Sequence, residues 1–297
     1  MDIIQNAPSL SDRWIGRLTA LLWLVRPGNI LMIGAGVVVG RILTGDVLAS
    51  DPMHLLAVVC AACLVGAGAN ISNDIYDKEI DAKNKPERPL AAGRTSIAAA
   101  LVSAVLLTIG GLLLATFVSA THLLFAALIV ALLWFYNIRL KRVAVVGNVV
   151  VALCVAASLL FGAMGNGIDT VVMAGSVFAF LLTLGREIIK DVEDVEGDAA
   201  LGAKTLSVLV GPETGKKTAS VIVFVAATLA PLPYLILDFS SSYLAIVVFA
   251  DAWLLAAVWR LVSGRDGKED VRAASFSLKA AMFFGLLALV FSRGVPV

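Results

Sequence analysis

The chain has 297 residues, of which 60% are hydrophobic and only 15% are charged, and its mean hydropathy is +0.94. Soluble domains carry about 25% charged residues, so the composition indicates an integral membrane protein and excludes a soluble enzyme. The formal net charge of +1 gives no basic surface of the kind that binds DNA or RNA, which excludes nucleic acid as a natural partner.

Apolar stretches of about twenty residues, the length that crosses a bilayer, recur along the whole chain. The first is interrupted by the sequence from Arg26 to Asn29, and no separate soluble segment is visible. We therefore predict a single all-α domain over residues 1–297, a polytopic bundle of nine transmembrane helices. The predicted spans are 18–40, 54–75, 97–118, 121–138, 144–163, 169–188, 219–237, 243–261 and 274–292.

Two acidic clusters directly follow the second and the sixth predicted spans. The aspartates stand at i, i+3 and i+7 in both, as Asp74, Asp77 and Asp81 and then as Asp191, Asp194 and Asp198. On an α-helix this spacing places three carboxylates along one side. Because the spacing repeats four spans later, we predict a parallel internal repeat, with two four-helix units followed by a ninth span.

The clusters are typical of a site for divalent metal and phosphate. Carboxylates of one sign at the ends of membrane helices repel one another unless positive charge lies between them. Oxygen ligands with no flanking His or Cys favour Mg²⁺ over zinc. The loops 76–96 and 189–218 also carry Lys and Arg residues, which neutralise phosphate oxygens. For any single Lys, a solvated loop position remains the alternative.

Orientation follows from the basic residues in the loops. Seventeen Lys and Arg residues fall in the loops on one side of the predicted bundle, and only Arg41 and Arg293 fall on the other. By the positive-inside rule, we predict a multi-pass protein of the cell membrane with its N-terminus and both acidic clusters on the cytoplasmic side.

Paired acidic clusters at the mouth of an apolar bundle suit the ionisation of an allylic diphosphate. Mg²⁺ and basic side chains stabilise the departing pyrophosphate, and the carbocation left behind needs a wall that excludes water. Aromatic side chains are candidates to form that wall, and the alternative is that they only pack against neighbouring helices. These residues are Trp134, Phe135, Tyr136, Phe178 and Phe180. A transporter of Mg²⁺ or organic anions is a further alternative, but it predicts acids near the middle of a span.

These features resemble the UbiA superfamily of intramembrane prenyltransferases. Its first motif, NDxxDxxxD, is present from Asn73 to Asp81, and its second, DxxxD, from Asp194 to Asp198. The resemblance extends over the nine predicted spans and the long loops that follow the second and the sixth. It implies Mg²⁺ as the cofactor, a polyprenyl diphosphate as the donor, and contact with membrane lipids.

The resemblance also implies roles for individual residues. The metal ligands would be Asn73, Asp77, Asp191, Asp194 and Asp198, and the catalytic acids would be Asp77, Asp81, Asp194 and Asp198. Asp74 would bind metal or orient basic residues. The substrate-binding residues would be Arg26, Asn29, Asn70, Arg88, Tyr136, Lys141 and Lys204, with Arg142 as a further candidate. An Arg inside a membrane span is functional by default, which supports Arg26 independently.

Within the superfamily, two stretches resemble the digeranylgeranylglyceryl phosphate synthases of archaeal-type ether lipid synthesis. They are NDIYDKEIDAKNKPERPLAAG at 73–93 and REIIKDVEDVEGDAALGAKTL at 186–206. This implies geranylgeranyl diphosphate as donor and a lipid phosphate, geranylgeranylglyceryl phosphate, as acceptor, whose glycerol hydroxyl attacks C1 of the prenyl group. Chlorophyll synthases share parts of both motifs, so an aromatic, quinone-precursor or chlorophyllide acceptor remains open. No residue stands out as a general base.

Overall fold

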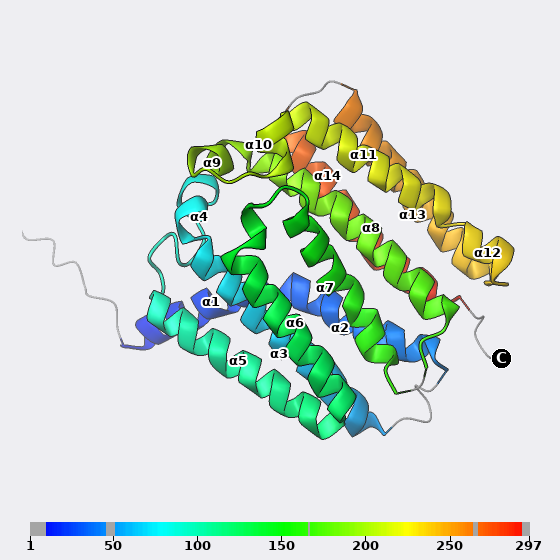
Figure 1. The fold of residues 1–297 in the computed structure, drawn as a ribbon, viewed down its shortest axis with the longest axis horizontal. Coiled ribbons are helices and arrows are strands. Elements are labelled where there is room, and N and C mark those ends of the chain that lie inside the picture. Colours follow the sequence, from blue (N-terminus) through cyan, green and yellow to red (C-terminus); the bar gives the residue numbers. More distant parts are fainter. Residues whose placement is uncertain (1–9, 46–50, 166, 264–266, 293–297) are drawn as a thin grey trace, which may run out of the picture.

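The structure is a computed structural model that describes residues 10–45, 51–165, 167–263 and 267–292 (Figure 1). In these ranges the chain is almost entirely helical, and its one extended pairing is an isolated bridge between Val143 and Lys204. The helices are α1 (Leu10–Val25), α2 (Pro27–Leu43), α3 (Pro52–Tyr76), α4 (Lys78–Asn84), α5 (Ile97–Val118), α6 (Ala120–Ile138), η1 (Leu140–Arg142), α7 (Val146–Ala163), α8 (Thr170–Glu193), α9 (Val195–Ala200), α10 (Leu206–Val210), α11 (Pro212–Leu229), α12 (Leu232–Ile236), α13 (Ser241–Val262) and α14 (Lys268–Val290).

The prediction of nine membrane spans is confirmed. Among the described residues, eight helices are long and apolar enough to cross a membrane, and the pair of α1 and α2, bent by 47°, makes nine when it is counted as one span. The bend lies at Arg26, whose φ of 57° is left-handed. Pro27 follows with no backbone N–H to donate, so the helix is interrupted where the sequence predicted.

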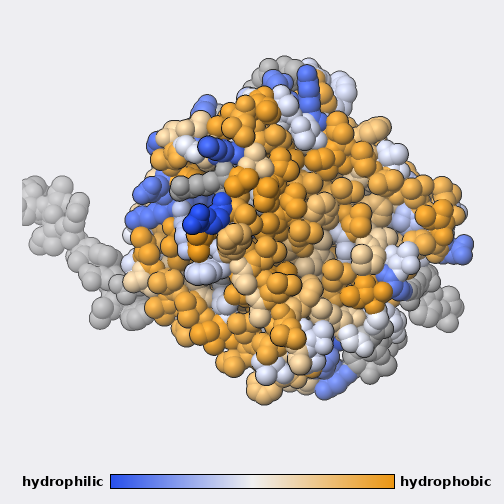
Figure 2. Space-filling model, viewed as in Figure 1, coloured by the Kyte–Doolittle hydropathy of each residue, from blue (hydrophilic) through white to orange (hydrophobic). Residues whose placement is uncertain are grey.

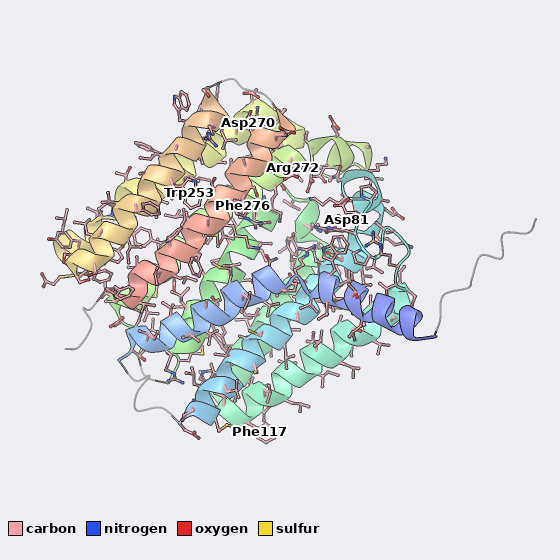
Figure 3. All side chains as sticks on the ribbon, turned by 180° about the vertical axis from the view of Figure 1, so that it is seen from behind. Asp81, Phe117, Trp253, Asp270, Arg272 and Phe276 are labelled. Atoms are coloured by element: carbon pink, nitrogen blue, oxygen red, sulfur yellow. The ribbon has the colours of Figure 1, made fainter. Side chains whose placement is uncertain are left out.

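The outer surface is that of a membrane protein. Hydrophobic residues cover most of the face in Figure 2, and hydrophilic residues lie at its edges, among them a patch where Figure 1 shows α4 and α9. Phe117 is 83% exposed near the C-terminal end of α5, and Asp81 lies within α4 at another edge of the molecule (Figure 3). Large exposed apolar side chains of this kind are stable where lipid replaces water.

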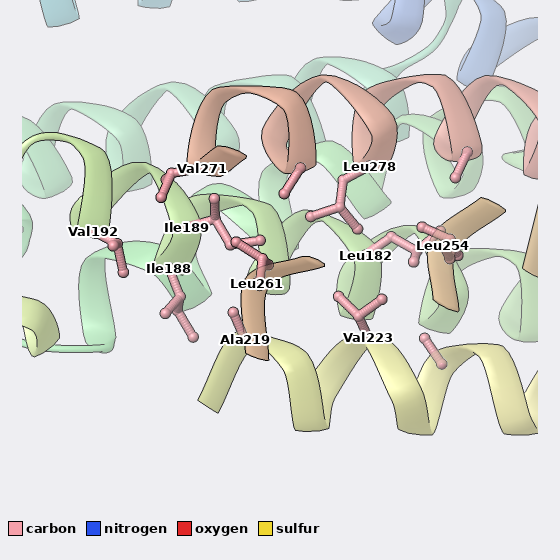
Figure 4. Packing of buried hydrophobic residues seen from close by; sticks show 13 residues of the cluster. Leu182, Ile188, Ile189, Val192, Ala219, Val223, Leu254, Leu261, Val271 and Leu278 are labelled. Atoms are coloured by element: carbon pink, nitrogen blue, oxygen red, sulfur yellow. The ribbon is translucent and has the colours of Figure 1, made fainter. Parts of the chain in front are cut away.

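Helix packing divides the bundle into two parts that meet along α2 and α7. α3 packs on α5 and α6, whereas α8 packs on α11 and α14 around a buried apolar cluster (Figure 4). A Cβ atom at Gly40 would lie 2.0 Å from the carbonyl oxygen of Leu159, and one at Gly162 would lie 1.9 Å from that of Val37. The α2 and α7 backbones are therefore in contact, as small residues allow in membrane bundles.

The two acidic segments have the same local structure, in agreement with the predicted repeat. α3 ends and α4 begins at Asp77 (φ −90°, ψ −1°), and α8 ends and α9 begins at Asp194 (φ −94°, ψ 3°). Neither cluster therefore lies on one continuous helix, which corrects the expectation from the spacing. Like charges four residues apart weaken a helix, and Asp is a poor helix former. α4 and α9 then lie side by side (Figure 1).

Candidate active site

The first acidic cluster is held by two arginines at the end of α3. Asp74 is buried and accepts hydrogen bonds from Arg26, at the α1–α2 bend, and from Arg88, at 3.1 Å. Arg88 also donates to Asp81 at 2.7 Å, so one guanidinium group joins two of the three carboxylates. Burial raises the pKa of the Asp81 carboxyl group, and the charge of Arg88 opposes this rise.

Asp77, the central aspartate of the first cluster, has different partners from Asp74 and Asp81. Its carboxylate contacts the ammonium group of Lys141 and accepts a 2.9 Å hydrogen bond from the Asn73 side chain. Lys141 lies in η1, between α6 and α7, and also donates to the Asn73 amide oxygen at 3.0 Å. Its ammonium group lies 5.9 Å from the centre of the Tyr136 ring. Residues expected to bind metal and substrate thus meet here.

The second acidic cluster is joined to the first through the loop after α4. Lys85 Nζ donates to Asp194 at 2.5 Å, while Asp191 accepts a 2.9 Å hydrogen bond from Asn148 of α7. Asp198 is 7% exposed. Its burial, together with the charges of Asp194 and Asp77, raises the pKa of its carboxyl group to about 6, against the opposing charges of Lys141 and Lys85. The two clusters therefore face each other at one end of the bundle.

A cavity of about 350 Å³ opens beside these clusters. Its polar part contains six of the predicted site residues, namely Arg26, Asn29, Asn70, Asn73, Arg88 and Tyr136. Its apolar part is lined by residues such as Ile33, Phe125, Ile129, Leu133 and Phe161. Asn70 donates to the backbone carbonyl of Val25 at 2.9 Å and so fixes the end of α1 against α3. A charged head group and a long apolar chain would fit the two parts.

Two of the predicted substrate-binding residues are not placed at the acidic clusters by the described structure. Lys204 is exposed, and its backbone pairs with Val143 next to η1, so its side chain is not held on the acidic clusters. The side chain of Arg142 lies outside the described part of the chain.

Only one of the five expected aromatic residues lines the large cavity in the described part of the chain. Trp134 and Phe135 are 64% and 51% exposed and face outward from α6. Phe178 lines a separate apolar cavity of about 70 Å³, and Phe180 is half-buried on α8. Of the five candidates, Tyr136 lines the large cavity, together with Phe125 and Phe161. α6 is apolar on all sides, so its sequence does not indicate which side faces inward.

Other charged and polar residues at the site were missed. Glu187 accepts hydrogen bonds from Arg186 at 3.2 Å and from Lys190 at 2.7 Å, and all three line the large cavity. Lys279 of α14 donates to the Asn29 side chain at 3.3 Å. Each stands inside a predicted or observed span, and a charged residue in an apolar span is the signal that could have identified it.

The donor atoms fit Mg²⁺ in their chemistry. Among the described residues, no three His, Cys, Asp or Glu side chains converge closely enough to form a metal site. The carboxylates are neutralised by ammonium and guanidinium groups, with Lys141 at Asp77 and Lys85 at Asp194. The carboxylate oxygens of buried Asp198 and the amide oxygen of half-buried Asn73 complete a hard donor set of the kind that Mg²⁺ prefers.

Comparison with known proteins gives a consistent assignment. A model of the UbiA prenyltransferase family matches residues 30–287. The digeranylgeranylglyceryl phosphate synthase of Methanopyrus kandleri is 40% identical over 275 residues, which are 93% of this chain and 99% of that protein. The enzyme of the same name from Methanothrix thermoacetophila is 35% identical, over 91% of this chain and 97% of that protein.

Solved structures show the same fold. A structure of a digeranylgeranylglyceryl phosphate synthase superposes with a TM-score of 0.72 and 30% identity, over 93% of this chain and 98% of that chain. A UbiA homologue from Archaeoglobus fulgidus bound to DMAPP and Mg²⁺ superposes with a TM-score of 0.69 and 20% identity, over 91% of this chain and 98% of that chain.

Proposed function

Because the chain belongs to the UbiA prenyltransferase family, we propose that it transfers a geranylgeranyl group from its diphosphate to the glycerol hydroxyl of geranylgeranylglyceryl phosphate. The relatives named digeranylgeranylglyceryl phosphate synthase support this acceptor, since they match this chain over almost its full length. The observation that carries the proposal is the contact between Lys85 and Asp194, which joins the two acidic clusters beside a cavity with an apolar end.

In this proposal the cofactor is Mg²⁺. Asn73 and Asp77 would hold it from the first cluster, and Asp191, Asp194 and Asp198 from the second. When bound, Mg²⁺ neutralises and polarises the diphosphate oxygens. The structure of the Archaeoglobus fulgidus homologue, which contains Mg²⁺, supports the use of a divalent metal in this fold.

The basic residues around the acids would bind the diphosphate. Lys141, Lys85 and Arg88 already lie against the carboxylates of Asp77, Asp194 and Asp81, respectively. Their positive charges would stabilise the oxygens of pyrophosphate as the bond to C1 of the prenyl group breaks. The acids keep these side chains in place, which is how Asp81 would contribute to catalysis. Lys204, which is exposed next to η1, would have to turn its side chain toward the clusters to contact the leaving group.

The prenyl chain and the acceptor would occupy the two parts of the cavity. The apolar part, with Phe125 and Phe161, would exclude water from the carbocation. Arg26, Asn29, Asn70 and Tyr136 would orient the acceptor at the polar part. The glycerol oxygen forms the new bond to C1, and its proton passes to a pyrophosphate oxygen or to an aspartate.

The site would lie at the cytoplasmic face of the cell membrane. The loops that contain Lys85, Arg88, Lys141 and Lys204 surround the acidic clusters at one end of the bundle. An excess of Lys and Arg of this kind is typical of the cytoplasmic side. Arg265 and Arg293, which also entered the prediction of orientation, lie outside the described residues.

An acceptor panel tests the proposal. The purified protein in lipid nanodiscs would be incubated with labelled geranylgeranyl diphosphate, Mg²⁺ and one of four acceptors: geranylgeranylglyceryl phosphate, hydroxybenzoate, a quinone precursor or chlorophyllide. We expect an ether product from the first, and none in the D77A/D194A double variant. Prenylation of another acceptor without the ether product would contradict the proposed substrate. Flux of Mg²⁺ or pyrophosphate across liposomes without any product would support a transporter instead.

A further inference from the structure

Lys279 places a charged side chain inside the last membrane span. It is half-buried in α14 and lines the large cavity. Its Nζ donates to the Asn29 side chain at 3.3 Å, and a Cβ atom at Gly28 would lie 2.9 Å from the same nitrogen. The ammonium group therefore lies against the bend between α1 and α2, where glycine leaves space for it.

The charges that line the cavity are unbalanced. Its described lining contains five cationic side chains and one acidic side chain, Glu187. Arg26 and Arg88 are paired with the aspartates behind them, whereas Arg186 and Lys190 share Glu187. Within the described chain, the contact made by Lys279 is to the neutral amide oxygen of Asn29.

An ammonium group without a counter-charge is costly at membrane depth. A bound anion would neutralise it, and phosphate oxygens accept charge-assisted hydrogen bonds from lysine. The cavity at Lys279 thus has the character of an anion site.

Lys279 lies on a different wall of the cavity from the residues proposed to bind the diphosphate. Lys279 belongs to the wall formed by α14, which packs on α2 and α8. The acidic clusters belong to the ends of α3 and α8 and to the short helices α4 and α9. If the diphosphate of the prenyl donor binds at those clusters, the α14 wall of the cavity stays free for the acceptor.

We propose that Lys279 binds the phosphate monoester of the acceptor and so selects a lipid with an anionic head group. This inference rests on the proposed function. In a prenylated glycerol phosphate, the phosphate and the free hydroxyl share one short glycerol unit. A phosphate held by Lys279 would therefore keep the hydroxyl within reach of C1 of the donor, and Asn29 would hold the lysine in place.

Kinetics with two acceptors test this role. K279Q, K279R and the control K217Q, at an exposed lysine of α11, would be assayed in nanodiscs with geranylgeranylglyceryl phosphate and with its dephosphorylated form. We expect K279Q to raise the KM for the phosphorylated acceptor by about tenfold or more. It would leave the KM for geranylgeranyl diphosphate and the turnover of the dephosphorylated acceptor within about twofold. K279R would restore most of the loss, and K217Q would behave as the wild type.

Other results would overturn the inference. A higher KM for geranylgeranyl diphosphate in K279Q would assign Lys279 to the donor. Equal losses with both acceptors, without rescue by K279R, would indicate a structural role.

A binding measurement separates this inference from the proposed function. The affinity of labelled geranylgeranylglyceryl phosphate for the protein would be measured without donor and without Mg²⁺. Weaker binding to K279Q than to the wild type would support the anion site even if the wild type did not prenylate this lipid. Equal binding would contradict the site even if the wild type did.

Discussion

Lys85 donates a 2.5 Å hydrogen bond to Asp194, across 109 residues of sequence, and this contact joins the two acidic segments of the molecule. Asn84 supports it by donating to the backbone carbonyl of Asp194 at 3.2 Å. A Cβ atom at Gly197 would lie 2.1 Å from the Asn84 side chain, so glycine at this position allows α4 and α9 to approach. The loop after α4 thus positions a cation over the second cluster.

Replacement of Lys85 by methionine should weaken donor binding. The variant keeps the apolar stem but loses the charge that would contact pyrophosphate, so we expect the KM for geranylgeranyl diphosphate to rise about tenfold. Steady-state kinetics in nanodiscs would measure it. K83M changes an exposed lysine two positions earlier and should have little effect. An unchanged KM in K85M would mean that the contact with Asp194 is structural alone.

Loss of either central aspartate should abolish turnover. D77A and D194A remove proposed metal ligands from the two clusters, and loss of metal-based charge stabilisation worth several kcal/mol should lower kcat/KM by about a thousandfold or more. Both variants should still insert and bind detergent normally, as size-exclusion chromatography would show. E79A, at an exposed acid of α4, is the matched control. Near-normal activity in D77A or D194A would contradict the metal assignment.

Arg26 should matter for substrate binding more than for folding. In R26A, Arg88 would still neutralise Asp74 at 3.1 Å, so the end of α3 should keep its structure. The cavity would lose a cation at its polar part, and the KM for the acceptor or the diphosphate should rise by about tenfold. Assays that vary each substrate in turn would identify which one is affected. If both KM values were unchanged, Arg26 would have no place in the site.

Protonation of Asp198 should link stability to pH. An unfolded Asp loses its proton at about pH 4, whereas the buried Asp198 keeps it until about pH 6. The folded state therefore binds this proton more tightly than the unfolded state does. The resulting stabilisation is complete below the pKa of the unfolded state and is lost as the pH rises through the pKa of the folded state. Without Mg²⁺, D198N should raise the free energy of unfolding at neutral pH by up to ~2 kcal/mol and should not change it below about pH 4.

Thermal unfolding in detergent at the two pH values would measure this effect. E79Q, at an exposed carboxylate, should show no comparable difference. A lower Tm for D198N than for the wild type at neutral pH would contradict the proposed cost of the buried charge.

Local patterns in the sequence predicted the framework of the molecule. Apolar runs define the spans because crossing a bilayer requires a fixed helix length. Arg26-Pro27 marks the bend, since proline removes a helical hydrogen bond. The repeated spacing of the aspartates predicted two equivalent segments, and Asp77 and Asp194 do adopt nearly the same backbone conformation. These features each depend on residues that are close in sequence.

The remaining features depend on contacts between distant segments. Lys85 could not be assigned to Asp194, or Asn148 to Asp191, because the sequence does not give the positions of the helices relative to one another. The rotation of α6 about its own axis cannot be predicted from its sequence either, so the expectation that Trp134 lines the wall is wrong, because its side chain is 64% exposed. The sequence shows a lysine, Lys279, inside the last span. It does not show that this side chain points toward the α1–α2 bend.

The glycine contacts between α2 and α7 also bear on how a product would leave. Gly40 and Gly162 hold these two backbones against each other, so the pair cannot separate without losing an extensive close contact. Met32 of α2 and Val155 of α7 both line the large cavity, so we expect no lipid to pass between these two helices. We therefore expect a product with two long tails to leave the cavity between other helices.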